Sequence, residues 1–459
     1  MEGRGRAAGT DPATGTLVVL PSPTFAVAEL RKITGIQFYE ERMLFLTLLL
    51  RAPELRMVYL TSLPVDEAIV RYYLRFLPDP DGARRRLVLL HLDDPSPLPL
   101  TEKLLHRPEV LAQVRDLAGP ADDAHVLPFN ITWAEHDLTE LLGLPVYGPH
   151  PDLVPLGSKS GSRQVARRAG VPVLPGTEDL FGLEEVEKAV AAIRAERPET
   201  RSVVIKLNDG FSGQGNAIVH LDGLASPLPA SDTTFCAGDE SWPSFAAKIA
   251  QGGSIVEALI EADGLVSPSV QVRIAPSGSF EVISTHDQIL GGPRNQVYLG
   301  CRFPADPVYR LAIQSAALDV AEVLASEGVI GSFGIDFLVV PGPRPEVYLS
   351  EINLRMGGTT HPYWMTRLAT GAVYDTDRGE LLAGGRPRCY VATDNLKSKR
   401  LVGRTPAEVI DAVDRAGLAY DPATATGAAL HLMGAIPGFG KMGATCIAES
   451  TDDADELSK

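Results

Sequence analysis

Short apolar runs alternate with segments of helical spacing over the first third of the chain. Four runs predict strands, namely TLVVLPS, RMVYLTS, RRLVLLHLDD and HVLPFNI. Between and after them, the spacing of apolar residues predicts helices over Pro64–Leu77, Thr101–Ala118 and Ala134–Leu142. Strands that alternate with helices favour a doubly wound α/β domain with a parallel sheet. No GxGxxG motif follows the first strand, so the pattern does not support dinucleotide binding.

The segment GIDFLVVPGPRPEVYLSEINLR predicts two strands joined by a turn at Pro341–Pro345. In the second strand Glu351, Asn353 and Arg355 alternate with aliphatic residues, so their side chains share one face of the sheet. Closing the hairpin brings Asp336 opposite Glu351, give or take one residue of register.

These polar side chains predict a site for a divalent cation and a phosphate. The oxygens of Asp336, Glu351 and Asn353 are ligands that hard cations such as Mg²⁺ prefer, and Arg355 is a donor suited to phosphate. The alternative is an ordinary solvated face. Because the acids lie within apolar runs that should be buried, unpaired carboxylates would be costly, and a metal or cationic partner is favoured.

A glycine-rich loop follows a strand that carries Lys206 in the segment SVVIKLNDGFSGQGNAIVHL. Glycines let backbone N–H groups approach phosphate oxygens, and the lysine adds a positive charge. We therefore expect Lys206, Gly213, Gln214 and Gly215 to contact phosphate, although a plain turn would have a similar sequence. The loop is not a Walker motif, because the lysine precedes the glycines and a strand follows them.

Two further segments complete a nucleotide site. Glu257 ends a short apolar strand, and the extended backbone from Ala258 to Ile260 is expected to offer amide and carbonyl groups to an adenine edge. Upstream, Lys159 opens an amphipathic helix that Gly170 closes, which suits a phosphate contact at the helix start.

In this order, Lys159, AGVPVLPG, Lys206 with its loop, Glu257, Asp336 and EINLR with MGGTTHP resemble the ATP-grasp ligases over about half of the chain. The resemblance implies that the lysines and the loop hold the ATP phosphates and that the hinge after Glu257 reads adenine. It also implies that Asp336, Glu351 and Asn353 bind Mg²⁺.

One position departs from the family pattern. Where its members commonly carry a ribose-binding acid, this chain has Ser267 or Ser269, and Glu261 is expected to take that role.

Three segments further resemble the actinobacterial peptide ligases of pheganomycin type, namely HDQILGGPRNQVYLGCRFPA, NLRMGGTTHPYWMTRLATGA and HLMGAIPGFGKMG. The resemblance implies an ADP-forming enzyme of peptide natural-product (antibiotic) biosynthesis. Such an enzyme joins a small amino-acid-like carboxylic acid to the N-terminal amine of a peptide through an acyl phosphate. Arg355 and Arg294 would stabilise the oxyanion, and His286 or Asp287 would act as general base for the amine.

Other functions remain open. The chain could be another ATP-grasp enzyme, such as an amino-acid ligase, a carboxylase or a phosphotransferase, although the Met-Lys-Met of a biotin carrier is absent. It could also be a nucleotide-binding scaffold without catalysis, against which the intact acids and Arg355 argue.

The resemblance divides the chain into a flexible tail (1–16), a pre-ATP-grasp α/β domain (17–155), an ATP-grasp α+β core with a Gly-rich lid (156–395) and a small C-terminal capping domain (396–459). In the last part, a helix is predicted over Arg400–Leu418 and a Gly-rich loop within Ala429–Ala448. The final TDDADELSK is predicted to be an acidic tail.

Composition narrows the choice of partners. Lys and Arg number 42 and Asp and Glu number 58, and the resulting net charge of −16 argues against nucleic acid as the main partner. The longest apolar run, MLFLTLLL, is far shorter than the roughly 20 residues that span a bilayer. The four cysteines show no CxxC spacing. A cytoplasmic enzyme is expected, without a membrane partner, and a homodimer is a possible assembly.

Overall fold

The N-terminal part of the chain forms a four-stranded parallel sheet in the order β3-β2-β1-β4. The computed structural model describes residues 13–209, 215–221, 228, 232–238, 240–260, 262, 264–291 and 297–459. The strands of this first sheet are β1 (Thr14–Leu20), β2 (Glu54–Thr61), β3 (Leu87–His91) and β4 (Ala124–Pro128). The predicted α/β domain with a parallel sheet is thus confirmed. The expected tail over residues 1–16 is wrong at its end, because β1 begins at Thr14.

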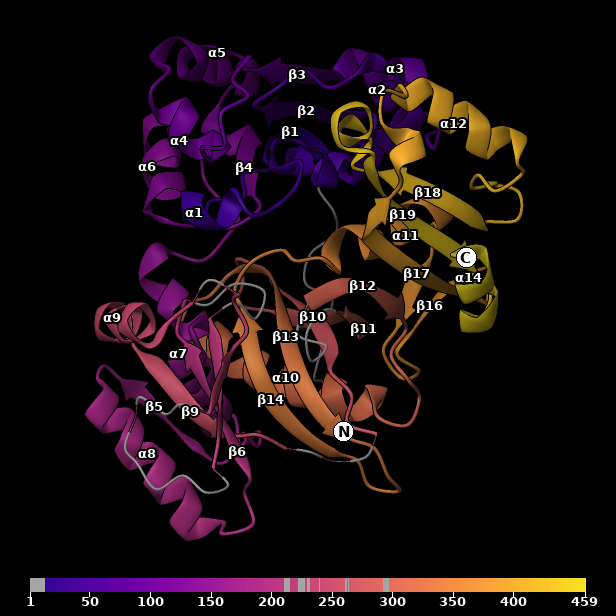
Figure 1. Cartoon of the computed structure of the whole chain (residues 1–459). Coiled ribbons are helices and arrows are strands. Elements are labelled where there is room, and N and C mark those ends of the chain that lie inside the picture. The colour runs from indigo at the N-terminus through magenta and orange to yellow at the C-terminus, as the bar shows by residue number, and fades with distance from the viewer. Residues whose placement is uncertain are drawn as a thin grey trace.

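Helices cover both faces of this sheet (Figure 1). Leu17 and Val19 pack on one side with η1 and α2, whereas Val18 and Leu20 pack on the other side with α4, α5 and α6. This alternation follows from the period of two in a strand. The helices are α1 (Val27–Leu30), η1 (Ile36–Arg51), α2 (Glu67–Leu74), α3 (Pro80–Arg86), α4 (Leu100–Leu105), α5 (Pro108–Ala118), η2 (Ala121–Asp123) and α6 (Trp133–Leu142).

Two details of this domain differ from the sequence pattern. The segment expected to form one helix up to Ala118 is split into α4 and α5, because the residue before Pro108 is disfavoured in helical conformation. The apolar run MLFLTLLL lies inside η1, a buried 3₁₀ helix, and contacts α11 (Thr360–Thr370).

A second, five-stranded sheet follows in the order β5-β9-β6-β7-β8. Its strands are antiparallel and comprise β5 (Gly176–Leu180), β6 (Ser202–Leu207), β7 (Asn216–His220), β8 (Thr233–Phe235) and β9 (Ser254–Ala258). The accompanying helices are η3 (Pro151–Gly157), α7 (Lys159–Arg168), α8 (Leu183–Glu196) and α9 (Trp242–Gly252). Lys159 opens α7 as predicted, directly after the N-cap Ser158.

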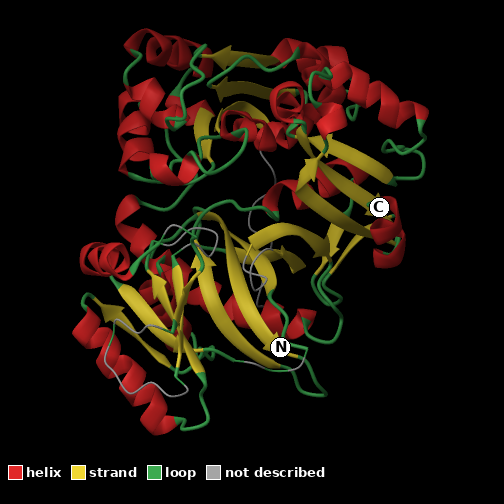
Figure 2. Ribbon diagram, in the orientation of Figure 1, coloured by secondary structure: helices red, strands yellow, loops and turns green. Residues whose placement is uncertain are grey.

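The third sheet has ten strands and is antiparallel. Its strands are β10 (Pro268–Ile274), β11 (Phe280–Gly291), β12 (Val297–Phe303), β13 (Gly331–Val340), β14 (Glu346–Asn353), β15 (Val373–Asp375), β16 (Glu380–Ala383), β17 (Arg386–Lys397), β18 (Gly427–His431) and β19 (Lys441–Ala448). Helix α10 (Arg310–Ser326) packs on β10 and β11. Figure 2 shows the strands of this sheet running from the lower centre to the right of the molecule.

The register of β13 and β14 is as predicted. Asp336 pairs with Glu351, and the strands are separated by the expected turn at residues 341–345. The register shifts between Asp336 and Phe337, so the irregularity lies directly after the acidic residue.

The C-terminal residues extend this third sheet rather than forming a separate layer. Strand β17 pairs with β12 on one edge and with β19 on the other, so the expected boundary at 395/396 falls inside β17. The predicted Gly-rich loop holds η6 (Met433–Ala435) and α13 (Ile436–Phe439), after η5 (Lys399–Leu401) and α12 (Pro406–Arg415).

The expected acidic tail is wrong. Residues Thr451–Leu457 form α14, which packs on β17 and β19, with Ala454 fully buried. The side chain of Ser450 caps the helix by accepting from the Asp453 N–H.

None of the helices in the described ranges has both the length and the apolar character needed to cross a bilayer.

A buried carboxyl joins the first and last parts of the chain. Glu41 in η1 accepts a hydrogen bond of 2.9 Å from the N–H of Gly434. A side chain at position 434 would place its Cβ 2.1 Å from Glu41 Oε1, so glycine is needed for this close approach. Burial, with a smaller contribution from the charge of Glu40, raises the pKa of Glu41 from 4.5 to about 8.

This carboxyl makes the free energy of unfolding depend on pH. Between pH 4.5 and about 8 the folded chain keeps a proton on Glu41 that the unfolded chain has lost, so stability should fall as the pH rises through this window. Glu41→Gln should flatten the slope, because the amide still accepts from Gly434 and has no proton to lose. Thermal unfolding measured from pH 5 to about 8.5 checks this. Exposed Glu54→Gln is the matched control, and an equal slope in both variants would contradict the assignment.

Candidate active site

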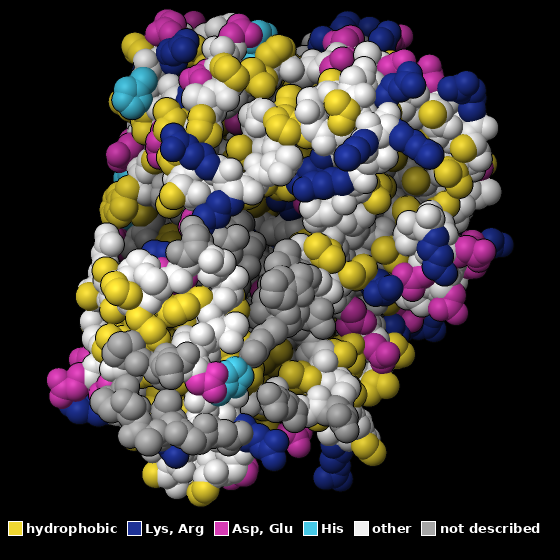
Figure 3. Space-filling view, viewed as in Figure 1, with side chains coloured by type: hydrophobic (Ala, Val, Ile, Leu, Met, Phe, Trp, Pro, Cys, Tyr) yellow, Lys and Arg dark blue, Asp and Glu magenta, His cyan; other side chains and the backbone are white. Residues whose placement is uncertain are grey.

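A cleft of about 1070 Å³ separates the five-stranded sheet from the ten-stranded sheet and extends to η1 of the N-terminal domain. Figure 3 shows the hollowed face, with Lys and Arg side chains along the upper rim of the hollow. The walls come from segments far apart in the sequence, so only the tertiary structure brings their side chains together.

The acidic side chains of the β13–β14 hairpin line this cleft. Asp336 accepts from Asn353 Nδ2 at 3.0 Å and from Gln288 Nε2 at 2.8 Å. Burial, followed by the neighbouring charge of Glu351, raises the pKa of Asp336 to about 7. Glu351 forms an ion pair with Lys159 at the start of α7, a helix that packs against β14.

This donor set fits a divalent cation. The carboxylates are close enough for the charge of Glu351 to raise the pKa of Asp336, and a cation between them would offset that repulsion. Oxygen ligands of this kind suit Mg²⁺. The Asn353 amide nitrogen faces Asp336, so a half-turn of this amide would bring its oxygen into the ligand set.

Arg355 continues the polar line at the end of β14. Its Nη2 donates to Asn353 Oδ1 at 2.9 Å and its Nη1 donates to the Met356 carbonyl at 3.1 Å. The guanidinium lies 5.5 Å from the centre of the Phe25 ring. These contacts hold the positively charged guanidinium of Arg355 beside the acidic residues on the cleft wall.

Glu257 is 1% exposed and lies behind the cleft wall, between two cations. Lys206 Nζ is 2.7 Å from its Oε2 and Arg163 Nη1 is 2.5 Å from its Oε1. Burial would raise the pKa of Glu257, but the charges of Lys206 and Arg163 together hold it below the ordinary value. Both carboxylate oxygens of Glu257 are thus paired with cations of the chain, and the contact of Glu257 that reaches the cleft is the one with Lys206. Arg163, in the middle of α7, carried no sequence signal for this pairing.

The segment after Glu257 has the form expected of a hinge. The N–H groups of Ala258 and Leu259 donate to the carbonyls of Pro175 and Ser202. Ile260 follows and lines the cleft, and no group in the described part of the chain accepts from its N–H.

Aliphatic side chains beside this hinge come from both sheets. Val204 of β6 and Ile218 of β7 line one wall, and Leu338 of β13 lines the other. A flat heterocycle would be enclosed between them, with the Ile260 backbone at its edge.

His286 does not reach the cleft. Its ring is fully buried, with Nε2 2.6 Å from the Tyr390 hydroxyl, and burial lowers its pKa to about 3. This placement argues against the general-base role expected for it. The neighbouring Asp287 lies on the other face of β11 and lines the cleft, where it accepts from the Tyr309 hydroxyl at 2.7 Å.

Four predicted site residues, Gly213, Gln214, Glu261 and Arg294, lie outside the described residues. Gly215 is described, and its carbonyl accepts from the Leu207 N–H at 2.9 Å, closing the hairpin between β6 and β7.

Two family models match the chain. The model described as IQCH-like, ATP-grasp covers residues 154–232 and 229–355, which include the residues of the cleft discussed above from Lys159 to Arg355. The model described as the PGM1 C-terminal domain covers residues 408–459.

Among curated proteins, the L-propargylglycine–L-glutamate ligase of Streptantibioticus cattleyicolor is 31% identical and spans 98% of this chain and 94% of that protein. IQ motif-containing protein H of Danio rerio is 20% identical over 78% of this chain, which matches 38% of that protein.

Solved structures show the same fold. Biotin carboxylase of Campylobacter jejuni, in complex with an ATP analogue, superposes with a TM-score of 0.58 at 14% identity, over 96% of this chain and 88% of that one. The N5-carboxyaminoimidazole ribonucleotide synthetase purK, in complex with ADP, has a TM-score of 0.55 at 13% identity, over 97% and 95%.

The structural likeness establishes the architecture, and the relative that matches from end to end establishes the kind of enzyme. The chain belongs to the pheganomycin-type ATP-grasp ligases, which join a carboxylate to an amine.

Proposed function

We propose that this enzyme uses ATP to join a small amino-acid-like carboxylic acid to the N-terminal amine of a peptide, in the biosynthesis of a peptide natural product. One observation carries the proposal. A single cleft between two sheets contains both parts of the site. The hinge after Glu257 lies there beside aliphatic side chains, and Asp336, Glu351 and Arg355 line another part of the same cleft. The relative from S. cattleyicolor supports an amino-acid-like substrate, because its name describes the joining of L-propargylglycine, a non-standard amino acid, and L-glutamate.

Each cleft residue has a role in this proposal. The adenine of ATP lies between Val204 and Leu338 against the Ile260 backbone, and Lys206 and Lys159 contact the phosphates. Glu257 holds Lys206 in position. Asp336, Glu351 and Asn353 would hold Mg²⁺, which would neutralise phosphate charge.

The chemistry requires no covalent bond to the protein. An oxygen of the substrate carboxylate attacks the γ-phosphorus of ATP, the bond to the β,γ-bridging oxygen breaks, and ADP leaves. The amine then attacks the acyl carbon, loses a proton and expels phosphate, which forms the amide. Arg355 lies beside the acidic residues and would stabilise charge on the transferred group. Catalysis in this scheme rests on positioning and charge neutralisation.

The products test the proposed route. ADP should form in a one-to-one ratio with amide when the enzyme receives ATP, an acid and a short peptide. L-propargylglycine and L-glutamate, the two amino acids in the relative's name, are suitable first substrates, each tested as the acid and as the amine. Hydroxylamine without peptide should trap the activated acid as a hydroxamate. AMP in proportion to amide would contradict the acyl phosphate, and multiple-turnover ADP release in the absence of both acid and amine would contradict the ligase.

A further inference from the structure

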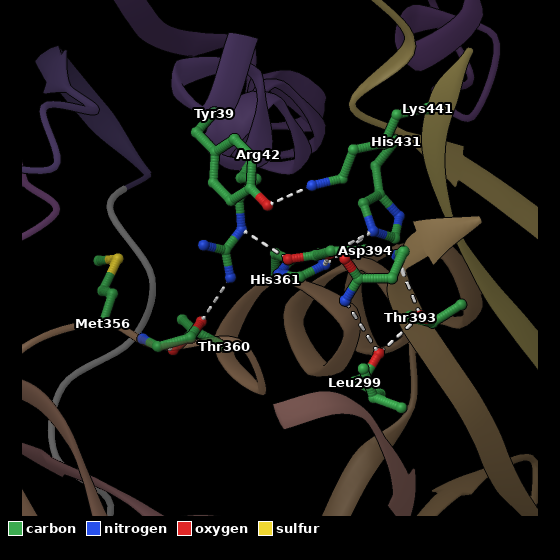
Figure 4. A network of polar contacts seen from close by, with 12 residues as sticks. Tyr39, Arg42, Leu299, Met356, Thr360, His361, Thr393, Asp394, His431 and Lys441 are labelled. Carbon is green, nitrogen blue, oxygen red and sulfur yellow. Dashed lines mark hydrogen bonds and ion pairs between the residues drawn. The ribbon is translucent and has the colours of Figure 1, made fainter. Parts of the chain in front are cut away.

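A second cluster of potential ligands borders the same cleft, which Asp394 lines. His361 at the start of α11, Asp394 in β17 and His431 at the end of β18 converge (Figure 4). They are 6%, 7% and 4% exposed. His361 Nε2 is 3.0 Å from His431 Nε2, and these nitrogens are 3.1 and 2.8 Å, respectively, from the same oxygen, Asp394 Oδ1.

Hydrogen bonds alone do not satisfy this triangle. A carboxylate oxygen only accepts, so both imidazole nitrogens must carry protons to donate to Asp394 Oδ1. Two protonated nitrogens would then face each other across the 3.0 Å between His361 and His431. If one nitrogen is instead unprotonated, its lone pair faces the carboxylate oxygen. Each assignment leaves one close contact repulsive, in a place where burial makes that contact costly.

We propose that these three side chains bind a divalent transition-metal ion, with Zn²⁺ as the ion that fits the ligand set. Two imidazole nitrogens and one carboxylate oxygen are the protein ligands of a three-ligand zinc site with an open fourth position. Ligands at about 2.0–2.1 Å from a tetrahedral zinc are about 3.3 Å apart. The separations of 2.8–3.1 Å here need only small ring rotations to reach that value.

The surroundings orient the ligands. Arg42 Nε lies 3.3 Å from Asp394 Oδ2, which leaves Oδ1 turned toward the histidines. Gly443 pairs with His431 across β18 and β19, and a Cβ at that position would lie 2.1 Å from His431 Nε2. The absence of a side chain at position 443 therefore makes room for the imidazole.

A metal bound at this position would have two consequences, one for the fold and one for the space available to substrate. The metal would tie α11, which follows the β14 strand of the acidic cluster, to β18 of the C-terminal segment. Asp394 also lines the cleft together with Arg42 and Lys441, so the open position of the metal would border the space available to substrate. The site differs in chemistry from the Asp336–Glu351–Asn353 cluster, whose ligands are all oxygens.

Metal content tests the proposal on the full-length protein. The chain is purified without chelator, stripped of metal with EDTA and then titrated with Zn²⁺ in the presence of Mg²⁺. It should bind one equivalent of Zn²⁺. Co²⁺ should give the visible absorption of a tetrahedral site, and Zn²⁺ should raise the melting temperature. His431→Ala should weaken Zn²⁺ binding by at least about 100-fold, more than the loss of an outer-shell contact costs.

Three further variants separate loss of the zinc ligands from unfolding and from loss of the magnesium ligands. Asp394→Asn keeps the size of the side chain but removes the anionic ligand, and it should also lose the Co²⁺ spectrum. Glu351→Gln and exposed His91→Ala should retain one equivalent of Zn²⁺. No saturable equivalent in the unmutated chain, or an equivalent that persists in folded Asp394→Asn, would overturn the proposal. Loss of zinc in Glu351→Gln alone would place the ion at the acidic cluster instead.

Discussion

Glu351→Gln is expected to lower ADP formation by at least about 100-fold, the size of effect seen when one preorganised electrostatic group is removed from an active site. Glu351 faces the cleft, is paired with Lys159 and lies opposite Asp336 in the sheet. Glutamine preserves its volume and removes the charge that would bind Mg²⁺. Initial rates measured at saturating ATP over a range of Mg²⁺ concentrations report the loss.

The matched control for this variant lies on the same strand. Glu346 begins β14 at an exposed position, so Glu346→Gln should retain the rate of the unmutated enzyme. Circular dichroism and thermal unfolding confirm that both variants are folded. A folded Glu351→Gln protein with an unchanged rate would show that the acidic hairpin does not bind the metal.

Lys206→Met is expected to raise the KM for ATP by about 10- to 100-fold. Lys206 points into the cleft near the hinge, and a hydrogen bond to a charged group contributes about 1.5–3 kcal/mol. The variant should fold, because Glu257 keeps its second partner, Arg163, at 2.5 Å. Steady-state kinetics and calorimetric titration with ADP measure the effect.

The control for the second variant is Lys188→Met, which removes an exposed lysine of α8 that is not among the residues lining the cleft. Its kinetic constants should not change. If Lys206→Met binds ADP with unchanged affinity and turns over ATP normally, Lys206 orients Glu257 rather than the nucleotide.

The local parts of this site could be predicted from the sequence because they depend on short-range rules. The period of two in SEINLR placed Glu351 and Asn353 on one face, and the proline-rich turn set the pairing of Asp336 with Glu351. Ser158 before Lys159 is an N-cap, so the start of α7 was also determined locally.

The sequence also determined the family, because the order of these motifs along the chain is itself specific. The comparison with the S. cattleyicolor ligase confirmed that resemblance. The same rules did not determine which face of β11 would be buried. His286 and Asp287 were both candidates for the general base, and the packing of His286 against Tyr390 decided that only Asp287 faces the cleft.

Partners separated by long stretches of chain were decided by the tertiary structure alone. Arg163 and Glu257 are 94 residues apart, and their pairing depends on how α7 packs against the second sheet. His361 and His431 meet 70 residues apart, only because the C-terminal strands continue the third sheet past β17. Periodicity and capping act over a few residues, whereas burial and charge pairing depend on which surfaces meet. The sequence thus determined the family and the placement of the acidic residues in the β13–β14 hairpin. The packing of the three sheets decided that Arg163 pairs with Glu257 and that His361 meets His431.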